Sequence, residues 1–215
     1  MLDALATVKT PMLFRKLYSD CIWSIPVKEQ TIFLTFDDGP QPGVTDFVLD
    51  VLKQHNAKAT FFCIGENVKN NLALFQRLSD EGHAVGNHTF NHLNGWKADN
   101  KQYYENIELC NRQLDAYATT YKGKKIFRPP YGKLYPTQYG YLKEKYSVVM
   151  WDVLSFDFDL NVDKEEVLEN ILNNTRSGSV VVMHDSIKAA AKVKYVLPLL
   201  LRHFSDKGYK FAAIC

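Results

Sequence analysis

Two adjacent carboxylates, Asp37 and Asp38, are the residues with the clearest potential for chemistry. They follow residues 31–36, an apolar and β-branched run typical of a buried strand, and Gly39-Pro40 ends that strand. Successive side chains of an extended chain point in opposite directions, so the two carboxylates can serve different partners. Because like charges at short range repel, we expect a cation or an arginine between them. Taken alone, the pair is equally typical of a solvated Asp-Gly turn.

More polar side chains follow the other segments that are predicted to be strands. They are Glu66, His88, His92, Arg128, Asp152, Asp157, His184 and Asp185. In a parallel α/β fold the carboxyl ends of the strands lie on one face, and sites are built there. We therefore expect these groups to converge in space. This convergence is stronger evidence for a functional site than any single motif.

His88 and His92 stand four residues apart, a spacing that places two imidazoles on one face if the turn is helical. Two imidazoles and one carboxylate form a facial ligand set that suits a divalent transition metal with open positions. Histidines at this spacing are also common as a surface pair or at the start of a helix. The carboxylates upstream and Arg128 downstream, on the same predicted face, favour the metal site.

Two further residues have both a catalytic and a structural interpretation. His184 follows four apolar residues at a predicted strand end, where a histidine is often a hydrogen-bonded core residue, but the neighbouring Asp185 favours a general acid. Arg128 enters a rigid Pro-Pro turn and is either a surface cation or a guanidinium fork that holds Asp37 or Asp157.

Several aromatic residues are candidates for the lining of a substrate groove. They are Trp96, Tyr131, Tyr135, Trp151 and Phe158. Core packing explains Trp151 equally well.

Strands and helices alternate along the chain from residue 30 onward. Apolar runs predict strands at residues 31–36, 59–64, 83–87, 126–128, 147–151, 179–183 and 209–214. Apolar residues at helical spacing predict helices at residues 44–55, 72–78, 107–117, 137–145, 167–172 and 193–204. Glycines that mark helix ends before the next strand are Gly82, Gly123, Gly178 and Gly208. The pattern indicates a parallel sheet covered by helices, and on its own it allows either an open sheet or a barrel.

The bulk composition excludes several classes of protein. The chain has 215 residues and a formal net charge of +2, which suits one α/β domain and gives no basis for nucleic-acid binding. No uncharged apolar stretch is long enough to span a bilayer. The start of the chain lacks the features of a signal peptide, so we expect a cytoplasmic location unless a leader has been removed. The cysteines show no framework spacing and are expected to be free thiols: Cys21, Cys63, Cys110 and Cys215.

Four ordered motifs resemble those of the NodB-type polysaccharide deacetylases of carbohydrate esterase family 4. They are Thr-Phe-Asp-Asp-Gly-Pro at residues 35–40, His-Thr-Phe-Asn-His at 88–92, Arg-Pro-Pro-Tyr-Gly at 128–132 and Val-Val-Met-His-Asp at 181–185. The resemblance covers residues 28–215, which we take as the catalytic domain. Residues 1–27 remain as a segment packed on that domain, with a helical turn predicted at residues 13–18.

The resemblance implies a distorted (β/α)7 barrel with parallel strands. It also implies a divalent metal bound by Asp38, His88 and His92. The metal is usually zinc in this family, and cobalt, nickel or manganese in some members.

Catalytic roles follow from the same resemblance. Asp37 is implied to be the base and is positioned by Arg128, whereas His184 is the acid. The backbone N–H of Tyr131 helps to hold the oxyanion. The base and the acid need opposite protonation states before reaction, which we expect Arg128 to favour for Asp37 and Asp185 to favour for His184.

One motif departs from the family pattern. The family commonly shows Asp-x-x-Asp-Trp after the fifth strand, with the first Asp supporting the arginine. In this chain Leu154 replaces that Asp and Phe158 replaces the Trp. We therefore expect Asp157 or Asp152 to support Arg128, and one side of the substrate groove to be reshaped.

The implied function is hydrolysis of N-acetyl groups on N-acetylglucosamine-containing poly- or oligosaccharides, such as chitin oligosaccharides or peptidoglycan, with release of acetate. The partner is then an acetylated carbohydrate, and we expect a monomer. The alternatives are an O-acetyl esterase acting on xylan, a small-molecule amidase, and a sugar-binding relic without activity. The complete set of catalytic residue types argues against the relic, and the apparent lack of a secretion signal favours the small-molecule amidase.

Overall fold

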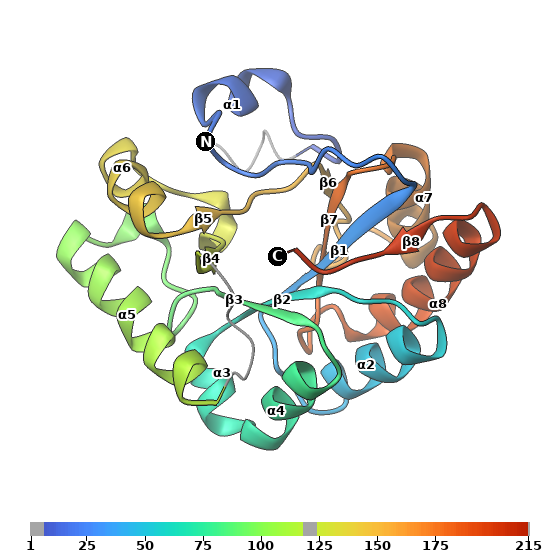
Figure 1. Cartoon of the computed structure of the whole chain (residues 1–215), viewed down its shortest axis with the longest axis horizontal. Coiled ribbons are helices and arrows are strands. Elements are labelled where there is room, and N and C mark those ends of the chain that lie inside the picture. Colours follow the sequence, from blue (N-terminus) through green and yellow to red (C-terminus); the bar gives the residue numbers. More distant parts are fainter. Residues whose placement is uncertain (1–6, 118–123, 215) are drawn as a thin grey trace.

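The computed structural model describes residues 7–117 and 124–214, in which strands alternate with helices. The strands are β1 Thr31–Asp37, β2 Thr60–Cys63, β3 Ala84–Asn87, β4 Ile126–Phe127, β5 Ser147–Val148, β6 Val153–Leu154, β7 Val180–His184 and β8 Lys210–Phe211. The helices are α1 Met12–Leu17, α2 Thr45–Gln54, α3 Gly65–Asn70, α4 Leu72–Asp80, α5 Asn100–Tyr117, α6 Pro136–Lys145, α7 Lys164–Asn174 and α8 Ala190–Asp206. Figure 1 shows the helices arranged around the outside of the strands.

The strands form one curved sheet in the order β5-β4-β3-β2-β1-β7-β6, with β8 paired to the start of β1. The named strands pair in parallel, and the register of β1 with β7 sets Asp37 opposite His184. The carboxyl ends of these strands therefore share one face, as predicted. The architecture is a distorted (β/α)7 barrel. Of the two architectures that the sequence pattern allows, an open sheet and a barrel, the protein has the barrel.

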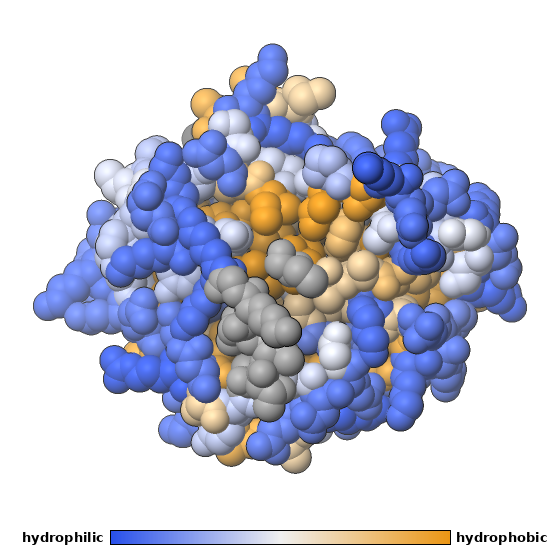
Figure 2. Space-filling view, in the orientation of Figure 1, coloured by the Kyte–Doolittle hydropathy of each residue, from blue (hydrophilic) through white to orange (hydrophobic). Residues whose placement is uncertain are grey.

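Both faces of the sheet are buried, which explains why its strands are apolar along their length. Under the helices, the side chains that the periodicity of α2 predicts to be buried, such as Val48 and Leu52, are fully buried. A separate cluster that includes Phe33, Phe62 and Ile214 lies among the strands. Figure 2 shows apolar surface at the centre of the face turned toward the viewer, within a hydrophilic rim.

The predicted elements are present, with shifted ends, and two short elements were missed. β6 has two residues and α3 buries only Gly65 and Val68, so neither is long enough to produce a periodic pattern. The last predicted strand, at residues 209–214, is reduced to the two residues of β8.

The cysteine prediction is confirmed where the structure describes these residues, and the glycine prediction is confirmed for Gly82 and Gly208. These two residues follow the C-caps of α4 and α8, with positive φ angles of 76° and 80°. Gly178 also has a positive φ, of 83°, but it lies in a turn beyond the end of α7 and does not cap that helix. The free thiols in the described ranges are all buried, and they belong to Cys21, Cys63 and Cys110. Gly123 and Cys215 lie outside the described residues. No helix of the described chain combines the length and apolar character needed to cross a membrane.

The N-terminal segment, described from residue 7, lies between the two ends of the sheet. Ile22 donates its N–H to the carbonyl of Val148 and accepts from the N–H of Met150, which joins it to the β5 side. On the β6 side, the N–H of Leu154 donates to the carbonyl of Val8. Figure 1 shows α1 above this gap, and α1 confirms the helical turn predicted there. The segment therefore contributes main-chain hydrogen bonds to the closure of the barrel, while the proposed domain boundary at residue 28 stays a prediction.

Asp152 fixes this segment through its buried carboxylate. It accepts hydrogen bonds from Lys9 Nζ (2.6 Å) and Ser179 Oγ (2.6 Å), and it forms an ion pair with Arg15. Burial disfavours the charged form of Asp152, but the hydrogen bonds from Lys9, Ser179 and Arg15 outweigh it and hold the pKa below its ordinary value.

We predict that Asp152→Ala lowers the free energy of unfolding by about 2 kcal/mol, because two charged donors and a buried hydroxyl lose their acceptor. Urea unfolding at neutral pH measures the change. Asp20→Ala is the matched control, since Asp20 is largely exposed, pairs with Lys143 at 3.2 Å and accepts from Ser19 Oγ at 3.5 Å; it should cost less than about 0.5 kcal/mol. Equal effects of the two substitutions would contradict the role of Asp152.

Candidate active site

The two adjacent carboxylates lie where β1 ends, and the chain turns sharply between them. Asp37 is the last residue of β1 and is buried, whereas Asp38 has a left-handed backbone with φ of 83°. Gly39 follows, and a Cβ atom there would come within 1.9 Å of the Asp185 carboxylate, so only glycine fits. The turn gives the two carboxylates different partners, as the sequence predicts, and the solvated Asp-Gly turn is wrong for Asp37.

Asp38, His88 and His92 lie close enough together to share one metal ion. Asp38 Oδ1 lies 3.8 Å from His88 Nε2 and 3.3 Å from His92 Nε2, and one ligand atom from each residue falls within 4.8 Å of the others. Asp38 Oδ1 is buried and has no hydrogen-bond partner, which is unfavourable for a carboxylate unless a cation completes the site. The geometry therefore fits a divalent metal.

The protonation of the imidazoles also suits metal binding, which requires the neutral form. Burial lowers the pKa of His88 to about 3, with a further contribution from His92. Burial also lowers the pKa of His92, against the attraction of the Asp38 and Asp37 carboxylates. Both rings are thus neutral at neutral pH, with a lone pair available for a cation.

The turn between the two histidines is not helical, so the four-residue spacing does not by itself place them on one face. β3 ends at Asn87, and Thr89 and His92 have positive φ angles of 63° and 58°, so the loop is irregular. Side chains hold its shape: the N–H of Thr89 donates to Asn87 Oδ1 at 2.8 Å, and the N–H of Leu93 donates to Thr89 Oγ1 at 2.9 Å. The imidazoles converge because of these loop contacts, with ring centroids 5.1 Å apart.

Arg128 is completely buried at the end of β4 and binds Asp37, so the interpretation as a surface cation is wrong. Its Nη1 atom donates to Asp37 Oδ1 at 2.6 Å and to Thr35 Oγ1 at 2.7 Å. Its other nitrogens donate to the carbonyls of Val149 at 3.2 Å and Met150 at 2.9 Å. The guanidinium is therefore satisfied without a second carboxylate.

The expectation that Asp157 or Asp152 supports Arg128 is wrong for both residues. Asp157 instead binds His184: its Oδ1 lies 2.7 Å from His184 Nδ1, and its Oδ2 accepts from the His184 N–H at 2.8 Å. Asp152 lies at the barrel closure, as described above. Two main-chain carbonyls and the Thr35 hydroxyl provide the remaining acceptors for Arg128, which explains why Leu154 is tolerated where the family has an aspartate.

Asp157, not Asp185, determines the charge of His184. Burial opposes protonation of this imidazole, but the attraction of Asp157, Asp38 and Asp37 outweighs burial and raises its pKa to about 9. Asp185 accepts from the Gly39 N–H at 3.0 Å and from Thr45 Oγ1 at 2.5 Å. Its own pKa is raised to about 7, chiefly by burial. The expectation that Asp185 favours the protonated form of His184 is therefore wrong, and Asp157 has that role.

Thr35 was missed, although the sequence holds a signal for it. Residues two apart on a strand project from the same face, so a polar Thr35 two residues before Asp37 is placed to share its partner. Glu66, in contrast, was expected in the cluster, but it is exposed on α3.

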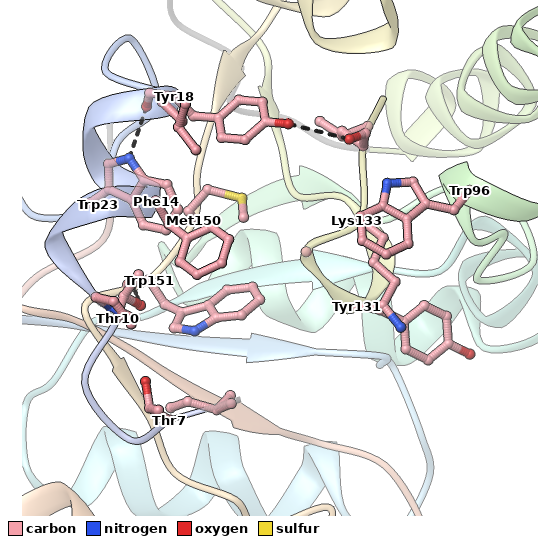
Figure 3. A pocket seen from close by; sticks show the side chains of 15 residues that line it. Thr7, Thr10, Phe14, Tyr18, Trp23, Trp96, Tyr131, Lys133, Met150 and Trp151 are labelled. Atoms are coloured by element: carbon pink, nitrogen blue, oxygen red, sulfur yellow. Dashed lines mark hydrogen bonds between the residues drawn. The ribbon is translucent and has the colours of Figure 1, made fainter. Parts of the chain in front are cut away.

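An apolar pocket of about 320 Å³ adjoins this site and opens between the N-terminal segment and the loop after β4. Three of the five aromatic residues predicted to line a groove line it: Trp96, Tyr131 and Trp151. Figure 3 shows Phe14 and Trp23 of the N-terminal segment facing them. Tyr135 lies beside it and donates to the Trp96 carbonyl at 3.3 Å, and Phe158 packs edge-on against His184 with ring centroids 5.1 Å apart.

Comparisons with known proteins agree with this geometry. A family model described as polysaccharide deacetylase matches residues 24–150. The chain is 34% identical over 194 residues to the peptidoglycan-N-acetylglucosamine deacetylase of Bacillus cereus, covering 89% of this chain and 90% of that protein. It is 32% identical to the peptidoglycan-N-acetylmuramic acid deacetylase PdaA of Bacillus subtilis, covering 87% and 71%.

A solved structure extends the similarity to the whole fold. The Bc1960 peptidoglycan N-acetylglucosamine deacetylase, in complex with 4-naphthalen-1-yl-N-oxidanyl-benzamide, superposes with a TM-score of 0.86 at 32% identity over 95% of each chain. These similarities place the chain in the class of carbohydrate deacetylases, which are hydrolases. The chain belongs to the polysaccharide deacetylases of carbohydrate esterase family 4.

We predict that Asp157→Asn lowers the pKa of His184 from about 9 to its ordinary value near 6.5 or below, because the largest attraction is lost while burial remains. The wild-type imidazole then stays protonated up to about pH 9, and the variant loses its proton at least two pH units earlier. An NMR titration of the metal-free protein measures both midpoints.

Asp185→Asn is the matched control for this titration. Asp185 is adjacent to His184 in sequence but its carboxylate binds Gly39 and Thr45, so the His184 midpoint should stay near 9. A titration midpoint of His184 that falls in Asp185→Asn and stays near 9 in Asp157→Asn would show that Asp185, and not Asp157, holds the proton on His184.

Proposed function

We propose that this protein is a divalent-metal-dependent hydrolase that removes N-acetyl groups from N-acetylglucosamine-containing polysaccharides or oligosaccharides and releases acetate. The observation that carries the proposal is the placement of the Asp38, His88 and His92 cluster beside two differently paired groups, Asp37 with Arg128 and His184 with Asp157. The deacetylases to which the chain is similar support an acetylated amino sugar as substrate.

In this proposal Asp38, His88 and His92 hold the ion, with zinc as our first choice and cobalt, nickel or manganese as alternatives. Carboxylate oxygen and neutral imidazole nitrogen are common zinc ligands, and three protein ligands leave positions open for catalysis. When bound, the ion supplies a Lewis acid that polarises the amide carbonyl and makes a water molecule more acidic.

Asp37 is the general base of the proposed reaction. Arg128 occupies its Oδ1 atom, whereas Oδ2 faces the cluster and lies 3.9 Å from His88 Nε2. This orientation aims one carboxylate oxygen at the space where the attacking water must lie. The guanidinium stabilises the ionised form, which is the form that accepts a proton.

His184 is the general acid, because an amine is a poor leaving group until it receives a proton. Its raised pKa keeps the ring protonated at neutral pH. Its Nδ1 atom is bonded to Asp157, so the other ring nitrogen, Nε2, is left to donate to the leaving amine. The backbone N–H of Tyr131 is proposed to stabilise the negative oxygen that forms during attack.

The decisive experiment is acetate release from chito-oligosaccharides, peptidoglycan and acetylxylan, each with zinc, with cobalt and after chelation. We predict release from the N-acetylated substrates that requires added metal. Release from acetylxylan alone would replace the proposal with an O-acetyl esterase, and binding of oligosaccharide without release under any metal would support a relic.

We predict that Asp37→Asn lowers kcat between about 10²- and 10⁴-fold but leaves zinc bound, because Asp37 contacts the water and is not a ligand. His88→Ala should lose both activity and zinc. Zinc content of the purified variants, measured by mass spectrometry after dialysis, separates the two effects. A His88 variant that retains a full equivalent of zinc would contradict its assignment as a ligand.

A further inference from the structure

The two imidazoles of the candidate metal site are held in different ways. His88 is buried, and its Nδ1 atom lies 2.8 Å from the carbonyl of Arg128, a main-chain group fixed by the barrel. His92 is less buried, and its Nδ1 atom lies 3.1 Å from the hydroxyl of Tyr131. The orientation of His92 therefore depends on a side chain, whereas that of His88 depends on the backbone.

The Tyr131 contact determines which ring nitrogen of His92 is available for a cation. Nε2 is the atom nearer the cluster, at 3.3 Å from Asp38 Oδ1. For Nε2 to offer its lone pair, the proton must lie on Nδ1, and that proton needs an acceptor. The hydroxyl oxygen of Tyr131 is in position to accept it.

The backbone of Tyr131 has an unusual conformation next to this contact. Its φ of 60° is a left-handed conformation that is unfavourable for a residue with a side chain, and it persists only where surrounding contacts enforce it. The ring lies edge-on to His92, with centroids 4.6 Å apart. Figure 3 shows the ring at the rim of the apolar pocket with the hydroxyl pointing away from the pocket.

We propose that Tyr131 is a positioning residue for His92: its hydroxyl fixes the Nδ1–H tautomer and the ring orientation with which His92 binds the metal. This proposal rests on the metal site of the proposed function. It adds a role for the hydroxyl to a residue that was expected to contribute a backbone N–H to the oxyanion and a ring to the lining of the groove.

Tyr131→Phe tests the proposal, because it removes the hydroxyl and keeps the ring that packs on His92. The matched control is Tyr135→Phe, which removes another half-exposed hydroxyl of the same rim, bonded at 3.3 Å to the Trp96 carbonyl. Zinc affinity is measured for the parent and both variants by competition with a chromophoric chelator. Loss of an outer partner of a ligating histidine typically weakens binding about 10- to 100-fold, so we expect this range for Tyr131→Phe and less than about twofold for Tyr135→Phe.

A second measurement reports on the tautomer without any metal or activity. Long-range ¹H–¹⁵N spectra of the metal-free protein should place the proton on Nδ1 of His92 in the parent and show mixed tautomers in Tyr131→Phe. Thermal unfolding of the metal-free variants should match the parent, which separates a local effect from a loss of folding.

Equal zinc affinity of Tyr131→Phe and the parent would overturn the proposal, and so would equal weakening in both phenylalanine variants. Acetate release by the parent is assayed in parallel. If the parent is active with zinc and Tyr131→Phe binds zinc normally, only this inference fails. If the parent binds no zinc, the metal site of the proposed function fails and this inference fails with it.

Discussion

The buried ion pair between Arg128 and Asp37 is the constraint on which the rest of the site depends. A guanidinium without solvent is stable only when a carboxylate and further acceptors surround it, since an unpaired buried charge costs several kcal/mol. The acceptors come from β1 and from the residues after β5, so the pair forms only if those strand ends meet inside the barrel. The fold thus produces the ion pair, and the pair orients the carboxylate that faces the cluster.

A second ion pair joins Asp157 to His184 at the end of the adjacent strand β7, and it favours a group that donates a proton rather than one that accepts it. The register of β1 with β7 sets Asp37 opposite His184, so the two titratable groups stand side by side. Arg128 favours the charged carboxylate, whereas Asp157 favours the charged imidazole. One group is therefore ready to accept a proton and the other to donate one, and the difference results from their partners rather than from the residues themselves.

The sequence predicted what local patterns determine. Strand and helix alternation and the shared face of the strand ends follow from spacing along the chain. The convergence of Asp38, His88 and His92 was expected from that shared face and from the family resemblance, but loop contacts rather than helical spacing bring the two imidazoles together. Pairings between distant segments were not predictable in the same way. The sequence prediction paired His184 with its neighbour Asp185 and assigned Asp157 to Arg128, whereas the path of the loop after β6 places Asp157 against His184. Residues 8–22 gave a signal for the short helix α1 but none for the main-chain hydrogen bonds with which this segment closes the barrel.

Leu154, which stands where the family has an aspartate, shows how contacts between distant segments determine which side chain a motif position needs. An aspartate there is unnecessary because Arg128 already has Asp37, Thr35 and two carbonyls as acceptors. A carboxylate at this position would also be poorly placed, since Leu154 is buried and lines the apolar pocket beside Trp151. The N-terminal segment forms the wall of that pocket next to Leu154, and the carbonyl of its Val8 accepts from the Leu154 N–H. Leu154 and the segment that closes the barrel therefore form the same apolar region of the molecule. Leu154 packs at a position where an ionised side chain would have no partner.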